Sequence, residues 1–121
     1  MTQLNINKAY PALIKLGDYK LPVKKAYEIY KLIKIIDDKY KFAVEEEKKY
    51  IKQFNGKINA DGSVSFENAE SFGQFQERLA ELNEMQLDIN VSAVVLNEAD
   101  LGNQTISPTD IFNLEGFVVF E

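Results

Sequence analysis

Between residues 22 and 55 the apolar positions recur at the spacing of an α-helix, and no glycine or proline follows Pro22 within the segment. Projected at about 100° per residue, the apolar side chains fall on one side and lysines populate the other. The pattern predicts a helix of roughly 50 Å, at about 1.5 Å per residue. Such a helix is longer than a small domain is wide, so different parts of it need different partners. Its apolar side consists of Ala26, Ile29, Leu32, Ile33, Ile36, Tyr40, Ala43, Val44, Tyr50, Ile51 and Phe54.

A second apolar stripe predicts a helix that begins after Asn68, a favourable N-cap, and ends near Gln86. The residues between the two helices read as a tight β-hairpin. A three-residue loop with Gly62 in the left-handed region would set Ile58 opposite Val64. We therefore expect the second helix to run back along the C-terminal half of the first. Its stripe consists of Phe72, Phe75, Leu79 and Leu82.

Short apolar runs at both ends of the chain predict a small sheet. Residues 4–7 and 12–16 are expected as short strands that Pro11 separates, because proline lacks a backbone donor. Residues 87–96 alternate between apolar and polar and are the clearest strand, placed to cover the first half of the long helix around Ile29, Leu32 and Ile33. Residues 117–120 are expected to close the chain as an apolar strand.

The remaining C-terminal residues carry the signals of one short helix. Ser107 is its expected cap, Pro108 suits its first turn, Asp110 is favoured by the helix dipole, and Gly116 ends it. Residues 97–104 are expected as a polar loop. The whole pattern predicts a single α+β domain over residues 1–121. In it, a long antiparallel helical hairpin packs with a small, mainly antiparallel β-sheet from the N- and C-terminal segments.

The residue types that carry most enzyme chemistry are missing. The chain has no histidine and no cysteine, so neither a Ser-His-Asp nor a Cys-His arrangement can form. Its six glycines form no phosphate-binding loop, and the acids at positions 45–47 point about 100° apart on consecutive helix positions. A glycosidase-like pair of acids is compatible with the many carboxylates, but nothing favours it. We expect a protein that is not an enzyme, with no cofactor, no metal and no membrane span.

Charge divides the chain into a basic and an acidic half. Residues 1–56 carry a net charge of +5 and residues 57–121 carry −10, which gives the total of −5. The two halves are expected to complement each other when folded. Lysines interleaved with aromatics can follow a nucleic-acid backbone, but acids dilute this face and favour a solvated surface. The candidate interaction residues are Lys24, Tyr27, Lys31, Lys34, Lys41 and Phe42 on the basic face, and Glu70, Glu77, Glu81 and Glu84 on the acidic face.

One acid interrupts the apolar side of the long helix. Glu47 projects into it, where an unpaired carboxylate would be unfavourable. The sequence leaves two explanations, an ion pair or a position at the edge of the apolar side. Arg78, the only arginine, lies at the flank of the second helix and within reach. We therefore predict a Glu47–Arg78 ion pair where the two helices meet.

Three binding roles fit these features. The first is a non-enzymatic structural or assembly component that acts through protein–protein contacts. The second is a small acidic inhibitor of a host protein, which competes for a basic surface. The third is a nucleic-acid-binding accessory protein that uses the lysine face. The uncovered flank of the long helix also leaves room for a homodimer.

Two stretches carry a resemblance to known proteins. They are Leu21-Pro22-Val23-Lys24, which opens the long helix, and Ile106-Ser107-Pro108-Thr109-Asp110, which is followed by Leu114-Glu115. With the order of elements over most of the chain, they resemble small uncharacterised proteins encoded by phages and prophages of low-GC bacteria. The resemblance implies a cytoplasmic protein of a bacterial host cell with a role in assembly or host interaction. It implies no particular functional residues.

Overall fold

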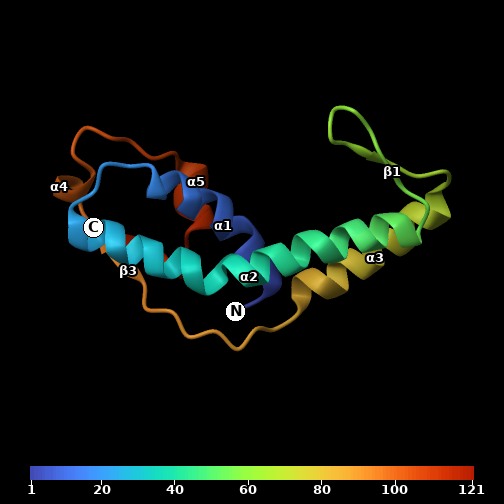
Figure 1. Cartoon of the computed structure of the whole chain (residues 1–121), viewed down its shortest axis with the longest axis horizontal. Helices are drawn as coiled ribbons and strands as arrows, with labels where there is room; N and C mark the ends of the chain where they lie inside the picture. The colour runs from blue at the N-terminus through green and yellow to red at the C-terminus, as the bar shows by residue number, and fades with distance from the viewer.

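Helix α2 (Val23–Gln53) is the axis of an elongated molecule, as the computed structural model of residues 1–121 shows (Figure 1). Its 31 residues run without a break, which confirms the long helix predicted from the apolar pattern. Pro22 stands at the N-cap, one position before the expected first turn. Different elements cover the two halves of α2, and no helix of the protein combines the length and apolar character needed to cross a bilayer.

The N-terminal segment forms helix α1 (Gln3–Gly17), so the prediction of two short strands there is wrong. Thr2 and Asn5 cap this helix reciprocally, each side chain accepting a hydrogen bond from the backbone of the other. Pro11 lies inside the helix and costs it a backbone hydrogen bond, but the side chain is exposed. A buried stripe at helical spacing outweighs that cost; its residues are Gln3, Ile6, Ala9, Ala12, Leu13 and Leu16.

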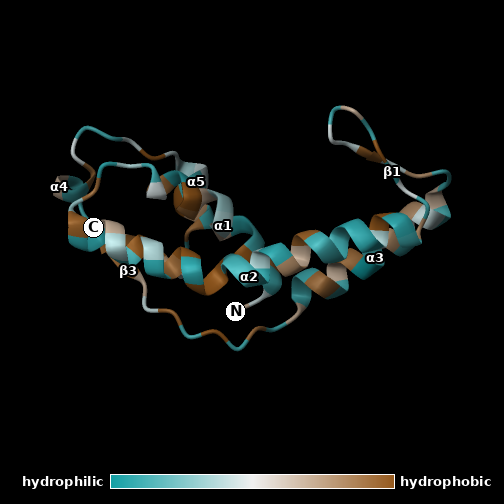
Figure 2. Ribbon diagram, in the orientation of Figure 1, coloured by the Kyte–Doolittle hydropathy of each residue, from teal (hydrophilic) through white to brown (hydrophobic).

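The C-terminal region contains a two-stranded sheet that is parallel. Strands β3 (Val94–Leu96) and β4 (Val118–Phe120) pair with Val95 opposite Val119, so the predicted antiparallel sheet with an N-terminal contribution is wrong. A parallel pair needs a long crossover, which the chain supplies between the two strands. Residues 88–93 of the predicted long strand are extended but make no backbone hydrogen bonds, and hydrophobic and hydrophilic positions alternate along them (Figure 2).

The crossover contains two short helices. Helix α5 (Pro108–Asn113) has Ser107 as its cap, as predicted. Helix α4 (Glu98–Leu101) falls within residues 97–104, which were expected to be a loop, because Asn97 and Asp100 form a reciprocal cap.

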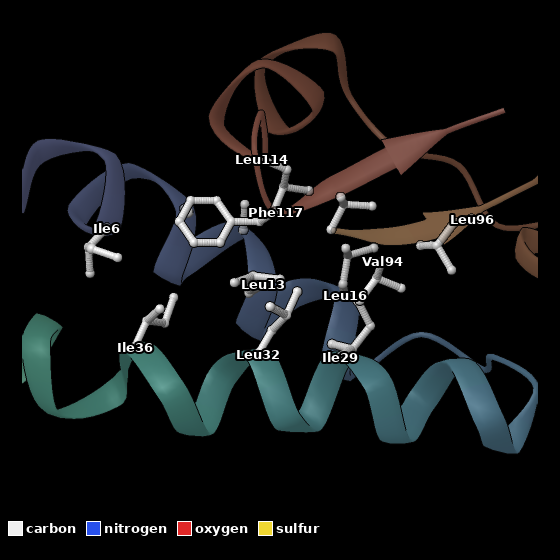
Figure 3. Packing of buried hydrophobic residues seen from close by; sticks show 13 residues of the cluster. Ile6, Leu13, Leu16, Ile29, Leu32, Ile36, Val94, Leu96, Leu114 and Phe117 are labelled. Atoms are coloured by element: carbon white, nitrogen blue, oxygen red, sulfur yellow. The ribbon is translucent and has the colours of Figure 1, made fainter. Parts of the chain in front are cut away.

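The larger hydrophobic core lies between α1, the first half of α2 and the C-terminal strands (Figure 3). Ile29, Leu32 and Ile36 of α2 face the buried stripe of α1. Val94 and Leu96 of β3 close the same cluster, so the predicted position of this strand beside α2 is confirmed. Leu114 and Phe117 are fully buried and fix the chain between α5 and β4.

Helix α3 (Ala69–Glu84) covers the second half of α2 and forms a smaller core there (Figure 1). Asn68 caps it, as predicted. Phe72, expected in the buried stripe, is 44% exposed and rests its ring on Phe66 at 5.6 Å between centroids. The buried residues of this smaller core are Ala43, Tyr50, Ile51, Phe75 and Leu82.

The turn between α2 and α3 is a β-hairpin of β1 (Lys57–Ile58) and β2 (Val64–Ser65). Ile58 pairs with Val64, and Gly62 has a φ of +87°. Both observations confirm the predicted three-residue loop.

Two glycines give a matched stability test of the smaller core. A Cβ on Gly56 would lie 2.7 Å from Cε1 of Phe66 and 2.9 Å from Cγ2 of Ile51. We expect Gly56→Ala to lower the free energy of unfolding by about 1–3 kcal/mol through overpacking. Gly73 lies inside α3 with open space around it, so Gly73→Ala should raise that free energy by about 0.5–1 kcal/mol. Urea denaturation of both variants measures the sign of each change in the free energy of unfolding. Equal changes for the two variants would contradict the packing at Gly56.

Candidate functional site

The first half of α2 exposes large side chains that a packed helix would bury. Val23 is 87% exposed, Tyr27 60% and Tyr30 47%. They lie beside exposed lysines because residues three and four apart share a helix face. The ammonium group of Lys31 lies 5.0 Å from the centroid of the Tyr27 ring, and that of Lys34 lies 5.9 Å from Tyr30. We call Lys24, Tyr27, Tyr30, Lys31 and Lys34 the tyrosine–lysine surface.

An apolar pocket of about 310 Å³ opens at the edge of this surface. Tyr19, Tyr30 and Lys34 are the lining residues whose side chains carry polar ends. The remaining lining residues are Ala26, Ile29 and Ile33 of α2, with Leu16, Gly17 and Leu21 from the end of α1 and the following turn. A cavity of this size is at the lower limit of small-molecule sites and suits one large apolar side chain.

Hydrogen bonds from the C-terminal region fix the wall of this pocket. The Gln104 side chain accepts from the N–H of Lys20 at 2.7 Å and donates to the Lys20 carbonyl at 3.1 Å. The Tyr19 hydroxyl donates to the carbonyl of Thr105. The turn between α1 and α2 is therefore tied at both Tyr19 and Lys20. The pocket is formed before any partner arrives, which lowers the entropic cost of binding.

The ammonium group of Lys41, a predicted member of the interaction surface, is paired on its own helix while the side chain stays 69% exposed. It lies 2.8 Å from the Asp37 carboxylate, which also accepts a hydrogen bond of 2.6 Å from the Tyr10 hydroxyl. The Tyr10 ring stacks on Tyr40 at 4.2 Å between centroids. This network joins α1 to α2. Lys41 therefore has a structural partner on the same molecule.

The network shifts the pKa of its members in opposite directions. Hydrogen bonds from Lys41 and then Tyr10 lower the pKa of the Asp37 carboxyl below its ordinary value. The hydrogen bond to Asp37, followed by desolvation, raises the pKa of Tyr10, so its phenol stays neutral at pH 7.

These shifts predict an acid-dependent loss of stability. A carboxyl with a lowered folded-state pKa stabilises the fold above its unfolded pKa, and the contribution disappears as pH falls through the folded value. We expect the stability difference between the wild type and Asp37→Asn to be present at pH 7 and to disappear as the pH falls below the ordinary pKa of an aspartate, about 4. Thermal unfolding across this range measures it. A difference that stays constant with pH would contradict the network.

The acidic candidates lie on α3 and do not meet the lysines of the first half of α2. All four are exposed. Glu81 and Glu84 line a shallow groove of about 490 Å³ together with Phe42 of α2. Glu70 and Glu77 are not among the residues that line it. Of the ten predicted residues, Lys24, Tyr27, Lys31 and Lys34 lie on the tyrosine–lysine surface and the four glutamates lie on α3. Phe42 lies beside Glu81 and Glu84, and Lys41 pairs with Asp37.

The predicted Glu47–Arg78 ion pair is wrong. The Arg78 guanidinium lies 3.6 Å from Glu81 on its own helix and 5.3 Å from the centroid of the Tyr50 ring. Glu47 is exposed, which agrees with the alternative of an edge position. The carboxylate of the neighbouring Glu46 lies 3.1 Å from the Lys49 ammonium group. It also accepts a hydrogen bond of 3.1 Å from the Tyr50 hydroxyl. The bond from Lys49 is the main cause of the lowered pKa of Glu46.

The tyrosine–lysine surface offers exposed aromatic rings and ammonium groups. No group of three or more histidine, cysteine, aspartate or glutamate side chains could hold a metal ion. Sequence reasoning missed Tyr30 and the pocket beside it, since the pocket needs the turn after α1 to fold back on α2. No protein-family model, curated protein or solved structure matches the chain.

Proposed function

We propose that the protein is a non-enzymatic interaction component whose tyrosine–lysine surface binds a partner protein. The observation that carries the proposal is the exposed Tyr27–Tyr30 pair beside a preformed apolar pocket. Tyrosines are enriched among the residues that dominate binding energy at protein interfaces, and such residues sit in or beside pockets. Apolar side chains exposed singly are ordinary, but here they gather on one face of one helix.

The chemistry of the surface defines the partner that would fit. The pocket takes one large apolar side chain, because its walls are apolar on both the α1 and α2 sides. Lys34 lines the pocket, and Lys24 and Lys31 are exposed on the same helix, so these lysines favour carboxylates near that anchor. The expected partner segment is therefore acidic with one apolar anchor residue.

A role in assembly agrees with this architecture and with the resemblance to phage and prophage proteins. We propose further that α3 and the second half of α2 form the antiparallel helical hairpin expected from the sequence. The shared cluster around Phe75 and Leu82 supports this arrangement. The hairpin then acts as an arm that extends away from the binding end.

The test begins by identifying the partner. The tagged full chain is used to purify bound proteins from the native host, and the candidate is then produced separately. Its affinity for the wild type is measured by calorimetry. A bound species that proves to be nucleic acid and dissociates with a steep salt dependence would contradict the proposal.

Two matched pairs of variants locate the binding site. Ala26→Leu fills the pocket from an exposed helix position, and Ala80→Leu makes the same change at an exposed position of α3. Lys34→Glu reverses a charge on the surface, and Lys52→Glu does so at the far end of α2. We expect the first member of each pair to weaken binding by about 2 kcal/mol and the second to have little effect. Equal affinity of all four would place the site elsewhere.

A further inference from the structure

The connection between α3 and β3 contains six extended residues whose backbone is unpaired. No N–H and no C=O group of residues 88–93 makes a hydrogen bond to another part of the chain. The segment forms the lower border of the molecule in Figure 1, outside α2. Extended backbone with free donors and acceptors is a template for another strand.

Contacts at both ends hold this segment in its extended form. On one side, the N–H of Leu87 donates to the Met1 carbonyl at 2.8 Å, next to the isolated bridge between Thr2 and Gln86. On the other side the segment continues into β3, which pairs with β4. Between these points Ile89 and Val91 pack against the larger core. The strand conformation is therefore fixed, while its hydrogen bonds are open.

A groove of about 300 Å³ runs beside the segment. One wall consists of Asn90, Ser92, Ala93 and Val94, and the other of Glu28, Lys31, Leu32 and Ile35 of α2. No residue of β4 lines this groove, so it lies on a different side of the segment from the existing strand pair. The half-exposed Ile35 gives it an apolar wall.

We propose that this segment is a dimerisation strand, which pairs antiparallel with the same segment of a second copy of the chain. The pairing is centred on Asn90, so that a two-fold axis relates the two copies. Each residue then meets its partner in the same way in both chains, as a closed symmetric dimer requires.

The residues of the segment complement themselves in this register. Ile89 of one copy faces Val91 of the other, and both belong to the side that packs on the core. Asp88 faces Ser92, so no two like charges oppose each other. Asn90 faces its own copy, where two amides can exchange hydrogen bonds. A second copy therefore supplies backbone partners for every second residue of the segment, together with matching side chains.

The wild-type chain supplies the first test, because the proposed partner is the protein itself. Sedimentation should show a monomer at low micromolar concentration and a dimer as the concentration approaches millimolar. In the dimer every second amide of residues 88–93 should exchange slowly with solvent, because an antiparallel pair hydrogen-bonds alternate residues of each strand, whereas in the monomer all of them exchange fast. A chain that stays monomeric, or a dimer in which these amides still exchange fast, would overturn the proposal.

Two cysteine variants test the register. The chain has no cysteine, and both Asn90 and Ser92 are exposed, so neither variant should disturb the fold. With the axis at Asn90, Asn90→Cys places two thiols opposite each other within disulfide distance. Ser92→Cys places them four residues apart across the pair, beyond that reach. We expect mild oxidation to give a covalent dimer only for Asn90→Cys. Equal cross-linking of both variants, or of neither, would overturn the proposed pairing.

Discussion

Replacing Phe117 by alanine is expected to lower the free energy of unfolding by about 3–5 kcal/mol. The side chain is fully buried and lies in the larger core between α1 and the strands (Figure 3). Phe117 stands directly before β4, and its carbonyl accepts a hydrogen bond of 2.9 Å from the N–H of Val94 in β3. Removing the ring leaves a cavity that the surrounding helices cannot close. The loss is a large part of the stability of a typical domain.

Urea denaturation followed by circular dichroism measures this effect. Phe112→Ala is the matched control, because that ring is 60% exposed and lies on the neighbouring helix α5. A surface change of this kind should stay within about 0.5 kcal/mol of the wild type. Similar midpoints for the two variants would mean that Phe117 does not belong to the core.

Phe75→Ala is expected to have a comparable cost of about 3–5 kcal/mol, but to act on the other end of the molecule. Phe75 is buried in the smaller core, where its ring lies 4.9 Å from Phe66 between centroids. This cluster shares only α2 with the larger core. Its loss should therefore open α3 and the β1–β2 hairpin first and leave α1 folded.

Native-state amide exchange distinguishes this local effect from a global one. In Phe75→Ala the amides of α3 should lose protection while those of α1 keep it. Phe72→Ala removes an aromatic ring of the same helix that is half-exposed, so it should cause a clearly smaller loss. An equal loss of protection in α1 and α3 would show that the two clusters are one cooperative unit.

The periodic parts of the fold could be predicted from the sequence. The long stripe of α2 and the stripe of α3 each extend over several turns, so the helical period is unambiguous. The loop at Gly62 followed from one glycine and from the pairing of apolar residues. In α1 the same logic failed, because Pro11 divided a helical stripe into two short runs that also fit strands.

Contacts between distant segments were the part that could not be predicted. The parallel pairing of β3 and β4 depends on where the crossover helices pack, and that is decided by burial of Leu114 and Phe117. The lysines and Tyr27 of the candidate site could be predicted from the sequence, because they lie on the polar side of the helical pattern. The pocket was not, because Gln104 and Thr105 must meet Tyr19 and Lys20 across more than 80 positions of the chain.

The central claim is that α2 is one unbroken helix that carries a core at each end. Because the chain has no cysteine, spin labels can be placed uniquely at Lys24→Cys and Lys52→Cys, two exposed positions near its ends. Dipolar spectroscopy should give a single narrow distribution, with the two Cα atoms no more than about 42 Å apart at about 1.5 Å per residue. A broad distribution, or several separate distances, would mean that the helix is split and would contradict the account.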